Sequence, residues 1–577
     1  MKGLITIVMA ALVLAEGAAI RAQPATRRFV PVTDAMLQKP DPADWLMWRR
    51  TSDGWGYSPL TQINRNNVSQ LKMVWAHGLA GPGSQEGTPI VHDGVIYVPD
   101  PGDHIMALDA KSGDVIWDYR RKLPEGVNNK TDRAIAMWGN FIINASADNF
   151  IYALDARTGK LAWETAVFGP KTRARTSGGP IIANGKVITG RQCQPDAGRD
   201  ACIVTAHDAR TGKELWRFHT IPGPGEPGDE SWGNVPMNER WHVGTWMVPS
   251  YDPELNLIIV GTSVTIPAPK FILAGNDKQH LFHNCTIAIN ADTGKMVWYY
   301  QHVVDHWDLD HPFERILVDT AVAPNPRDVS WINPKVKPGE RRKVVTGIPG
   351  KTGVVYTLDR TNGEFLWARP TVAQNVISTI EGNGAVIVNR EALWTKIDEE
   401  KVVCPSASSG GKNWPAGAYS PLTNTMYMPL QNMCMTATTT TDTRDPSKVY
   451  GLRMVPQLAP GMKMVGSVWA ISAETGMTTW KVEQPAGMLS LAVTAGGLVF
   501  GGDANGHFKA FDDRTGKVLW DINLGSSVSG YPISFAVDGK QYVAVITGPS
   551  GVANAEARLV PDLFQGNAPN VFVFALP

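Results

Sequence analysis

The sequence predicts an all-β fold, an eight-bladed β-propeller with tryptophan-docking repeats. The main observation is an eleven-residue phrase, ALDAKSGDVIW at 107–117, which recurs until seven copies are present. In every copy a Gly lies four residues before a Trp. Such repeats indicate units that cannot bury both faces alone and therefore stack on their neighbours. The other copies are ALDARTGKLAW at 153–163, AHDARTGKELW at 206–216, AINADTGKMVW at 288–298, TLDRTNGEFLW at 357–367, AISAETGMTTW at 470–480 and AFDDRTGKVLW at 510–520.

Each copy is predicted to form a β-hairpin. Apolar residues end one strand, the Asp-x-x-Thr-Gly segment is typical of a tight turn, and the residues before the Trp begin the next strand. The Trp can pack its ring against the neighbouring unit while its N–H finds a carbonyl. Trp75, in LKMVWAHG, is interpreted as a degenerate eighth copy. The uneven spacing of the copies favours propeller blades with long insertions over a linear solenoid, with a sandwich of similar turns as the alternative.

Composition and charge agree with this fold and exclude some functions. Gly and Pro account for 56 and 41 of the 577 residues, as many tight turns require. The net charge is zero and charged residues make up only 19%, which gives no electrostatic case for binding nucleic acid or an anionic membrane surface.

The first residues are predicted to be a signal peptide. Lys2 precedes an apolar run at 4–14, and Ala22 is a plausible residue before cleavage. No other apolar run is long enough to span a bilayer. We therefore expect a signal peptide at 1–22, followed by one eight-bladed propeller domain at 23–577 that is exported to the periplasm as a soluble protein.

The five Cys residues fit an oxidising compartment. Cys193 and Cys202 lie in one short segment that a bridge would close, and Cys404 and Cys434 flank a loop-rich stretch that could hold a second bridge. Cys285 is left over. The chain has no C-x-x-C pair and no C-x-x-C-H motif, so neither a thiolate metal site nor an attached c-type haem is expected.

Several segments besides the repeats resemble one family. They are QEGTPIVHDGVIYV at 85–98, SYDPELNLIIVGT at 250–262, YYQHVVDHWDLDHPF at 299–313, GKTGVVYTLDRTNGEF at 350–365, TAGGLVFGGDANGHFKAFD at 494–512 and DGKQYVAVITG at 538–548. From about Trp45 onward the chain is similar to the pyrroloquinoline quinone (PQQ)-dependent alcohol dehydrogenases, which resemble methanol and ethanol dehydrogenases. The resemblance implies an eight-bladed propeller with PQQ and a metal ion near its axis, an alcohol substrate and a cytochrome c that accepts the electrons.

The resemblance also implies a set of cofactor contacts. PQQ is a flat o-quinone with three carboxylates, so its site needs cations, an aromatic plate and polar groups. Arg133 matches the partner of a PQQ carboxylate, Trp246 matches the residue that stacks on the ring, and Arg360 matches the catalytic cation near the reactive quinone oxygen. The other expected contacts are Glu86, Ser177 (where Thr is usual), Thr245, Asn413 and Trp414.

Asp308 matches the catalytic base of the family, which takes the proton of the alcohol as hydride leaves carbon. Asp310 lies two residues further, where a strand-like stretch points both carboxylates to the same side. A second Asp at this place marks lanthanide-using members, so the resemblance implies either Ca²⁺ or a lanthanide ion bound by both residues. His306 and His311 flank the pair and could shape the pocket, relay a proton or be structural.

The other metal ligands depart from the family pattern. The usual Glu lies in a segment resembling G-x-S-G-A-E, whereas this chain has GRQCQPDAGRDAC, where Gln192, Gln194 or Asp196 could supply oxygen. The usual Asn lies in G-x-G-N-P, whereas this chain has GTSVTIPAP, with Thr265 as the nearest oxygen donor. The family's adjacent Cys pair is also missing. Two alternatives follow: a pseudoenzyme that has lost its metal site, and a non-catalytic propeller scaffold of the outer-membrane assembly type.

Overall fold

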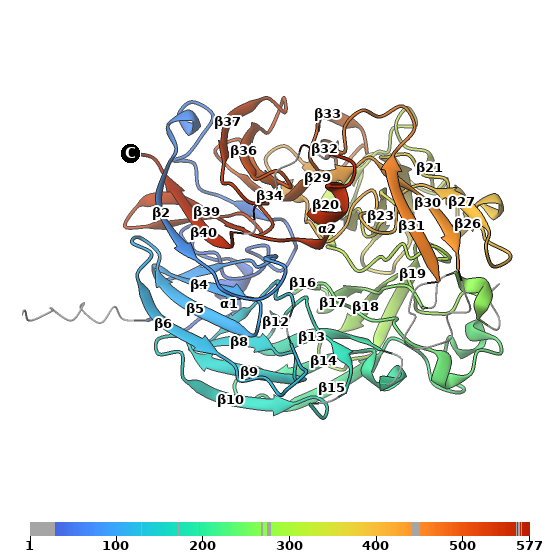
Figure 1. Cartoon of the computed structure of the whole chain (residues 1–577), viewed down its shortest axis with the longest axis horizontal. Coiled ribbons are helices and arrows are strands. Elements are labelled where there is room, and N and C mark those ends of the chain that lie inside the picture. The colour runs from blue at the N-terminus through green and yellow to red at the C-terminus, as the bar shows by residue number, and fades with distance from the viewer. Residues whose placement is uncertain are drawn as a thin grey trace, which may run out of the picture.

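The sheets of the protein are arranged radially, like the blades of a propeller. Figure 1 shows the chain passing from blue strands at the left through green and yellow to red strands that return beside the blue ones. The predicted signal peptide at 1–22 lies outside the described part of the chain. The computed structural model describes residues 29–577 except 129, 171, 195–196, 267–268, 274–277, 441–450, 561, 563–565 and 567.

The first half of the chain forms four antiparallel sheets, each built from consecutive strands. Each main strand pairs with the next one along the chain, so each sheet is a meander. The sheets comprise β3 (Ile90–His92), β4 (Val95–Asp100), β5 (His104–Asp109) and β6 (Val115–Arg120); β7 (Ala136–Trp138), β8 (Phe141–Ala145), β9 (Phe150–Asp155) and β10 (Leu161–Ala166); β12 (Ile181–Ala183), β13 (Lys186–Cys193), β14 (Ile203–Asp208) and β15 (Glu214–His219), with β11 (Ala174–Arg175) beside β13; and β16 (Ser250–Asp252), β17 (Leu257–Gly261), β18 (Cys285–Asn290) and β19 (Met296–Gln301). A long connection separates β17 from β18.

The second half forms four similar sheets, and the last one is completed from the other end of the chain. β2 (Lys72–Gly78) pairs antiparallel with β40 (Asn570–Ala575), which joins the N-terminal and C-terminal parts. The sheets comprise β20 (Ile316–Val322), β22 (Glu340–Gly347), β23 (Val354–Asp359), β24 (Phe365–Pro370) and β21 (Trp331–Ile332); β28 (Ala418–Ser420), β29 (Thr425–Gln431), β32 (Gly466–Ser472) and β33 (Thr478–Gln484); β34 (Met488–Thr494), β35 (Leu498–Asp503), β36 (His507–Asp512) and β37 (Val518–Asn523), with β1 (Tyr57–Ser58); and β38 (Ile533–Val537), β39 (Lys540–Thr547), β40 and β2.

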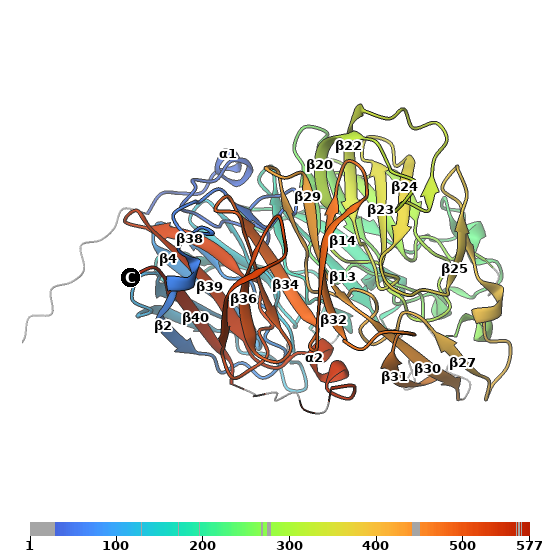
Figure 2. The same cartoon turned by 90° about the horizontal axis from the view of Figure 1, so that it is seen from above.

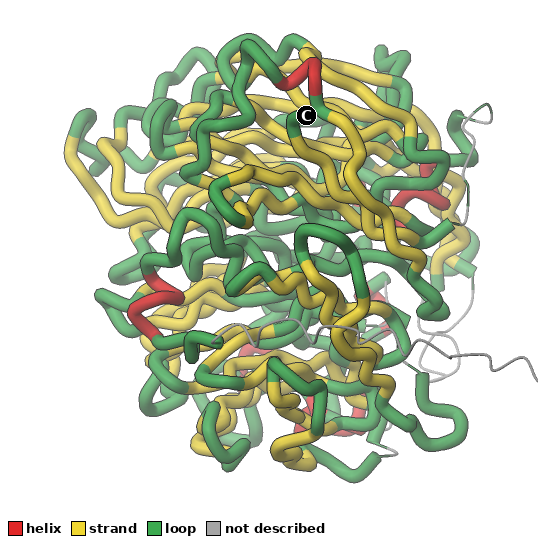
Figure 3. Tube along the Cα trace, turned by 90° about the vertical axis from the view of Figure 1, so that its left-hand side faces the viewer, coloured by secondary structure: helices red, strands yellow, loops and turns green. Residues whose placement is uncertain are grey.

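Two small sheets and a few short helices fill the long connections. β25 (Ile377–Ile380) pairs with β26 (Val386–Val388), and β30 (Met433–Thr439) lies between β27 (Glu400–Val403) and β31 (Leu452–Leu458). Figure 2 shows these strands at one side of the molecule, and Figure 3 shows how little of the chain is helical. The helices are α1 (Asp34–Gln38), α2 (Gly551–Glu556) and the 3-10 turns η1 (Val68–Gln70), η3 (Arg199–Ala201), η4 (Asp229–Trp232), η5 (Met237–Glu239), η6 (Lys270–Ile272) and η7 (Arg390–Ala392). Within the described residues, no helix is long and apolar enough to cross a membrane.

The repeated phrase forms the contact between neighbouring sheets, as predicted. A Cβ atom added at Gly159 would lie 2.7 Å from the Trp117 ring of the preceding copy, and the φ of Gly159 is +67°. The Trp117 indole also donates a hydrogen bond to the Ala156 carbonyl of the next hairpin (2.9 Å). Only Gly combines the positive φ with this close approach. The other Gly–Trp contacts of this kind are Gly113–Trp75, Gly212–Trp163, Gly294–Trp216, Gly363–Trp298, Gly476–Trp367 and Gly516–Trp480. The contact of Trp75 supports its interpretation as a degenerate copy.

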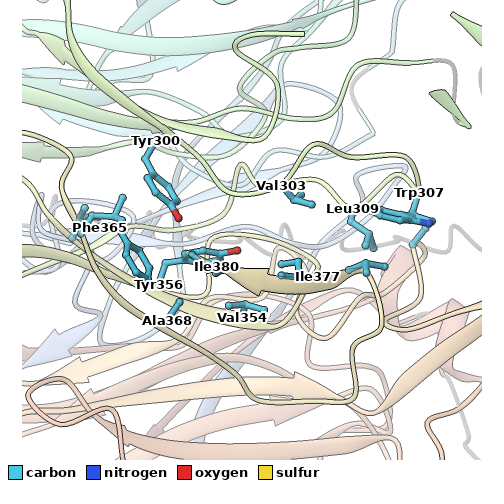
Figure 4. Packing of buried hydrophobic residues seen from close by; sticks show 14 of the residues in the cluster. Tyr300, Val303, Trp307, Leu309, Val354, Tyr356, Phe365, Ala368, Ile377 and Ile380 are labelled. Atoms are coloured by element: carbon cyan, nitrogen blue, oxygen red, sulfur yellow. The ribbon is translucent and has the colours of Figure 1, made fainter. Parts of the chain in front are cut away.

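A buried apolar cluster anchors the loop between β19 and β20, which carries the predicted base. Trp307 and Leu309 are fully buried in the same cluster as Val354 and Ile377 (Figure 4). The Trp307 indole donates to the Ala392 carbonyl (2.9 Å). Because both neighbours of residue 308 are packed into the protein, the position of this residue is fixed by the core.

Both predicted disulfides are confirmed. Cys193 is bonded to Cys202, with Cα atoms 4.6 Å apart, at the end of β13. Cys404 is bonded to Cys434, with Cα atoms 4.3 Å apart, and this bond ties the segment after β27 to β30. Cys285 is a free, buried thiol. Burial raises the pKa of the Cys285 thiol well above its usual range, which agrees with a structural residue.

Candidate functional site

Arg133 is the centre of the first part of the site. Its guanidinium forms an ion pair with Glu86, and its Nη1 donates to the Ser177 hydroxyl (2.8 Å). The carboxyl of Glu86 is buried, and burial raises its pKa although Arg133 lowers it. The Ser177 hydroxyl donates in turn to the Trp246 carbonyl (3.2 Å). Four residues expected from the sequence therefore contact one another.

Two indole rings lie beside the Arg133 guanidinium. Its Cζ is 5.2 Å from the Trp246 ring centroid and 5.6 Å from the Trp414 ring centroid. Trp246 meets Phe313 edge-on, with centroids 5.4 Å apart and an interplanar angle of 79°. Trp246 and Trp414 therefore lie beside a buried charge.

A short segment leads from Trp246 towards the predicted metal ligands. A Cβ added at Gly190 would collide with the Thr245 hydroxyl, so β13 lies directly against this segment. The Gln192 amide nitrogen donates to the Ser263 hydroxyl (3.2 Å) and lies 3.5 Å from the His242 Nδ1. The segment before Trp246 therefore contacts both sequence stretches that replace the family's usual ligands.

Asp308 forms the second part of the site with Asp310 and Lys351. The Lys351 ammonium lies 3.2 Å from Asp310 Oδ2 and 3.6 Å from Asp308 Oδ2, and it donates to the Asp308 carbonyl (3.0 Å). The second oxygen of Asp310 accepts a hydrogen bond from the Val264 amide (3.0 Å). Burial raises the pKa of Asp308 well above its usual range, Asp310 and Asp305 add to this rise, and Lys351 opposes it. Burial opposes protonation of Lys351, but Asp308 and Asp310 raise its pKa overall.

Asp310 connects the second part of the site to the first. It accepts a hydrogen bond from the Val264 amide, and the neighbouring residue Ser263 accepts one from the Gln192 side chain. The segment before Trp414 also contacts the second part, because the Gly411 amide donates to the Lys351 carbonyl (2.8 Å). Asn413 accepts from the Trp414 amide (2.8 Å) and donates to the Ser408 carbonyl (3.1 Å). The two parts of the site are therefore connected through protein contacts.

The other predicted metal ligands are engaged in local hydrogen bonds. The Thr265 hydroxyl donates to the Trp241 carbonyl (3.4 Å), and the Gln194 amide donates to the Cys193 carbonyl (3.4 Å). Asp196 lies outside the described residues. In the described parts of the chain, no group of three or more His, Cys, Asp or Glu side chains is arranged to hold a metal ion. Any ligand set must therefore include amide, hydroxyl or backbone oxygens beside the two carboxylates.

Three buried polar atoms of the site fit a bound polar group. Arg133 Nε, Thr245 Oγ1 and Asp308 Oδ1 are buried without a hydrogen-bond partner in the described structure. Buried polar groups normally have partners, so these atoms are available to a ligand. Two nitrogen or hydroxyl donors at one part and a carboxylate oxygen at the other suit the carboxylates of PQQ and a cation respectively.

Arg360 is not part of this constellation. Its guanidinium pairs with Asp252 (2.5 Å) and Asp319 (2.6 Å), and it lines a separate cavity of about 580 Å³ that also contains Trp55 and Tyr419. Lys351 and Arg360 lie at opposite ends of β23, which spans about 20 Å at the usual rise per residue. The cation beside Asp308 is therefore Lys351, which lies in the GKTG segment and was not among the predicted site residues.

His306 and His311 have different environments. His311 stacks on His302 with centroids 5.3 Å apart, and its Nδ1 bonds to the Leu309 carbonyl (2.8 Å). Burial lowers the pKa of His311 and of His306 to about 3 in each case. Both rings are therefore neutral at physiological pH, and the bonds of His311 are those of a structural residue.

Comparison with known proteins identifies the class to which this fold and site belong. The PQQ family described as glucose/ethanol/alcohol dehydrogenase, beta-propeller domain, matches residues 45–381 and 472–543. The chain belongs to this family of PQQ-dependent dehydrogenases.

Individual relatives cover most of the chain. It is 33% identical over 547 residues to quinohemoprotein alcohol dehydrogenase ADH-IIG of Pseudomonas putida, and the matched region covers 89% of this chain and 73% of that protein. It is 30% identical over 553 residues to lupanine 17-hydroxylase [cytochrome c] of a Pseudomonas species, covering 90% and 75% of the two chains. A europium-containing methanol dehydrogenase has a similar structure, with a TM-score of 0.82, 28% identity and coverage of 94% and 99%.

Proposed function

We propose that this protein is a PQQ-dependent alcohol dehydrogenase that oxidises an alcohol to an aldehyde or ketone. The observation that carries the proposal is the buried Asp308–Lys351–Asp310 group, connected to an Arg133 group with two indole rings. A non-catalytic scaffold has no need for such a buried arrangement of charges. When bound, PQQ supplies the two-electron acceptor for the hydride of the alcohol.

Arg133, Glu86 and Ser177 would hold the cofactor at one end. A guanidinium suits a carboxylate because it presents parallel N–H donors, and Arg133 Nε has no protein partner. Trp246 would support the flat ring, with Thr245, Asn413 and Trp414 as further contacts. This assignment keeps every cofactor contact expected from the sequence except that of Arg360.

Asp308 would take the proton of the alcohol hydroxyl. Its carboxylate must be ionised to act as a base, and burial alone opposes ionisation. Lys351 and a metal cation would both favour the ionised form, because opposite charge nearby lowers the pKa of a carboxyl. We assign to Lys351, rather than Arg360, the role of the cation that stabilises negative charge at the reacting centre.

Asp308 and Asp310 would hold the metal ion, either Ca²⁺ or a lanthanide. Both ions prefer carboxylate and other oxygen ligands, and a trivalent ion gains more from two carboxylates than a divalent ion does. Gln192, Gln194 and Thr265 are the proposed further ligands, because their segments lie beside Asp310 through Val264 and Ser263. The name of the europium-containing relative supports a lanthanide as one of the two choices.

The remaining parts of the proposal concern the whole chain. The eight large sheets would be the blades of a closed propeller at 23–577, preceded by a signal peptide at 1–22 that directs the protein to the periplasm. Pairing of β2 with β40 supports closure. A cytochrome c would accept the electrons, as the name of the lupanine-hydroxylating relative suggests.

The test is reconstitution of the metal-stripped protein with PQQ and either Ca²⁺ or La³⁺, followed by dye reduction across a panel of alcohols. We expect PQQ-dependent turnover that Asp308→Ala abolishes, while the exposed-turn variant Asp208→Ala keeps it. The preferred ion then identifies the metal. PQQ binding without turnover on any alcohol would favour the pseudoenzyme, and the absence of PQQ binding would favour the scaffold.

A further inference from the structure

Asp305 lies at the start of the loop that carries Asp308, and its carboxylate is fully buried. One oxygen accepts hydrogen bonds from the amides of Trp307 (2.7 Å) and Asp308 (2.8 Å). The other oxygen accepts from the amide of Leu309 (2.8 Å). Three consecutive backbone N–H groups therefore converge on a single side chain.

The backbone at Asp308 needs such support. Its φ is +69°, in the left-handed region that is unfavourable for residues with a Cβ. A non-Gly residue persists in this region only where surrounding contacts over-determine the conformation. Hydrogen bonds to an ionised acceptor are among the strongest available to a backbone amide, and Asp305 supplies three of them.

Asp305 is itself held in place. Its amide donates to the His283 Nε2 (3.2 Å), and His283 is fully buried. The flanking side chains of Trp307 and Leu309 are fixed in the core (Figure 4). The loop is thus secured by its backbone and its neighbours, whereas the Asp308 carboxylate contacts Lys351.

We propose that Asp305 is a positioning residue for the reaction, which fixes the Asp308 carboxylate in its reactive place by holding the backbone of 307–309. This inference rests on the proposed function, since it assigns Asp308 the role of the base. Asp305 itself touches neither substrate nor cofactor in this assignment. Reactions between positioned groups are sensitive to small displacements, so the effect of losing Asp305 should fall on turnover rather than on binding.

The experiment compares Asp305→Asn and Asp305→Ala in the PQQ-reconstituted protein with its metal. Asn keeps one oxygen that can accept the Trp307 and Asp308 amides, but its amide group cannot accept from Leu309. We expect kcat to fall about 10-fold for Asp305→Asn and about 100-fold for Asp305→Ala, with KM within about threefold of the parent. PQQ affinity, measured by quenching of tryptophan fluorescence, should stay within about threefold of the parent in Asp305→Asn.

The matched control is Asp208→Asn in a repeat hairpin. Asp208 also accepts two backbone amides, from Arg210 (3.0 Å) and Thr211 (2.9 Å), but it lies in an exposed turn. We expect its kcat to stay within about twofold of the parent, because surface changes away from special features have small effects.

Three results would overturn the inference. Parental kcat in both Asp305 variants would show that the loop holds Asp308 without this carboxylate. Parallel losses of kcat, PQQ affinity and unfolding temperature in Asp305→Asn would show a general structural role. Absence of PQQ-dependent turnover in the parent protein would instead refute the proposed function, and this inference with it. Because Asp305→Asn is nearly isosteric, it decides the question even if Asp305→Ala does not fold.

Discussion

The two parts of the site are built in different ways. Around Arg133, side chains from segments far apart in the sequence meet directly: Glu86 is 47 residues away and Ser177 is 44 residues away. Around Asp308, a single short loop supplies the carboxylates, and its backbone is held by Asp305. The first part therefore depends on which residues are present, whereas the second also depends on an uncommon backbone conformation.

This difference has consequences for substitutions. Losing a side chain at the Arg133 part should mainly weaken cofactor binding, because these residues hold the cofactor in place. Losing one at the Asp308 part should mainly slow turnover, because these residues act on the reacting atoms. Measurements that separate kcat from PQQ affinity test this division of the site.

The largest effect is expected for Asp308→Ala. Removing a positioned general base typically costs about 10²–10⁴-fold in rate, so we expect a loss of kcat in this range with little change in PQQ affinity. Steady-state kinetics of dye reduction and a PQQ fluorescence titration provide the two values. Retention of more than about a tenth of the parental kcat would remove Asp308 from the role of base.

A smaller loss is expected for Lys351→Ala, and it tests the exchange of Lys351 for Arg360. Removing a preorganised charge at a reacting centre costs about 10²–10³-fold, so kcat should fall by about 100-fold. Lys351→Arg should recover part of the activity, because it keeps the charge. Arg360→Ala is the control: it leaves the buried Asp252 without its partner and should lower the free energy of unfolding, but kcat should change by less than about threefold because Arg360 lies at the other end of β23. A large loss of kcat in Arg360→Ala with a small loss in Lys351→Ala would show that Arg360 is the catalytic cation, as the sequence predicted.

For Arg133→Ala we expect the effect on binding instead of turnover. The variant would remove the guanidinium that pairs with a PQQ carboxylate, and truncating one member of a buried charge pair across a binding interface typically costs about 2–5 kcal/mol. PQQ affinity should fall by at least about 30-fold, while kcat at saturating PQQ should change less. Arg133→Lys should be intermediate, because Lys lacks the fork of parallel donors. A kcat loss with unchanged affinity would contradict the division of the site.

The smallest effect is expected from the two disulfides, which form a matched pair. The amide of His242 donates to Cys193 Sγ (3.3 Å), so the Cys193–Cys202 bond lies against the segment leading to Trp246. Replacing either Cys pair by Ser should lower the free energy of unfolding by about 2–4 kcal/mol in a denaturant titration. Only Cys193→Ser/Cys202→Ser should also weaken PQQ or metal binding, and equal binding by both double variants would separate this bond from the site.

The sequence predicted those residues of the site that match residues of the family. The contacts among Glu86, Arg133, Ser177 and Trp246 follow the residues singled out by the resemblance. The role of Asp305 was not found, because its function is to accept backbone amides and no sequence motif for that is distinguishable from an ordinary turn carboxylate. Lys351 was present in a quoted segment, but nothing in the sequence indicated that it, rather than Arg360, approaches Asp308.

The repeat unit, the packing of its Trp on a neighbouring unit and the two disulfides could all be predicted from the sequence. The repeat is encoded within eleven residues of each hairpin, and five Cys residues allow few pairings. Which charges meet depends instead on the folded arrangement of the sheets. Asp308 and Lys351 are 43 residues apart and Arg360 and Asp252 are 108 residues apart, so their pairing depends on how successive sheets are placed side by side. Lys351 precedes β23 and Arg360 follows it, so the two cations lie at opposite ends of the sheet. Only the folded arrangement shows which of these ends lies beside Asp308.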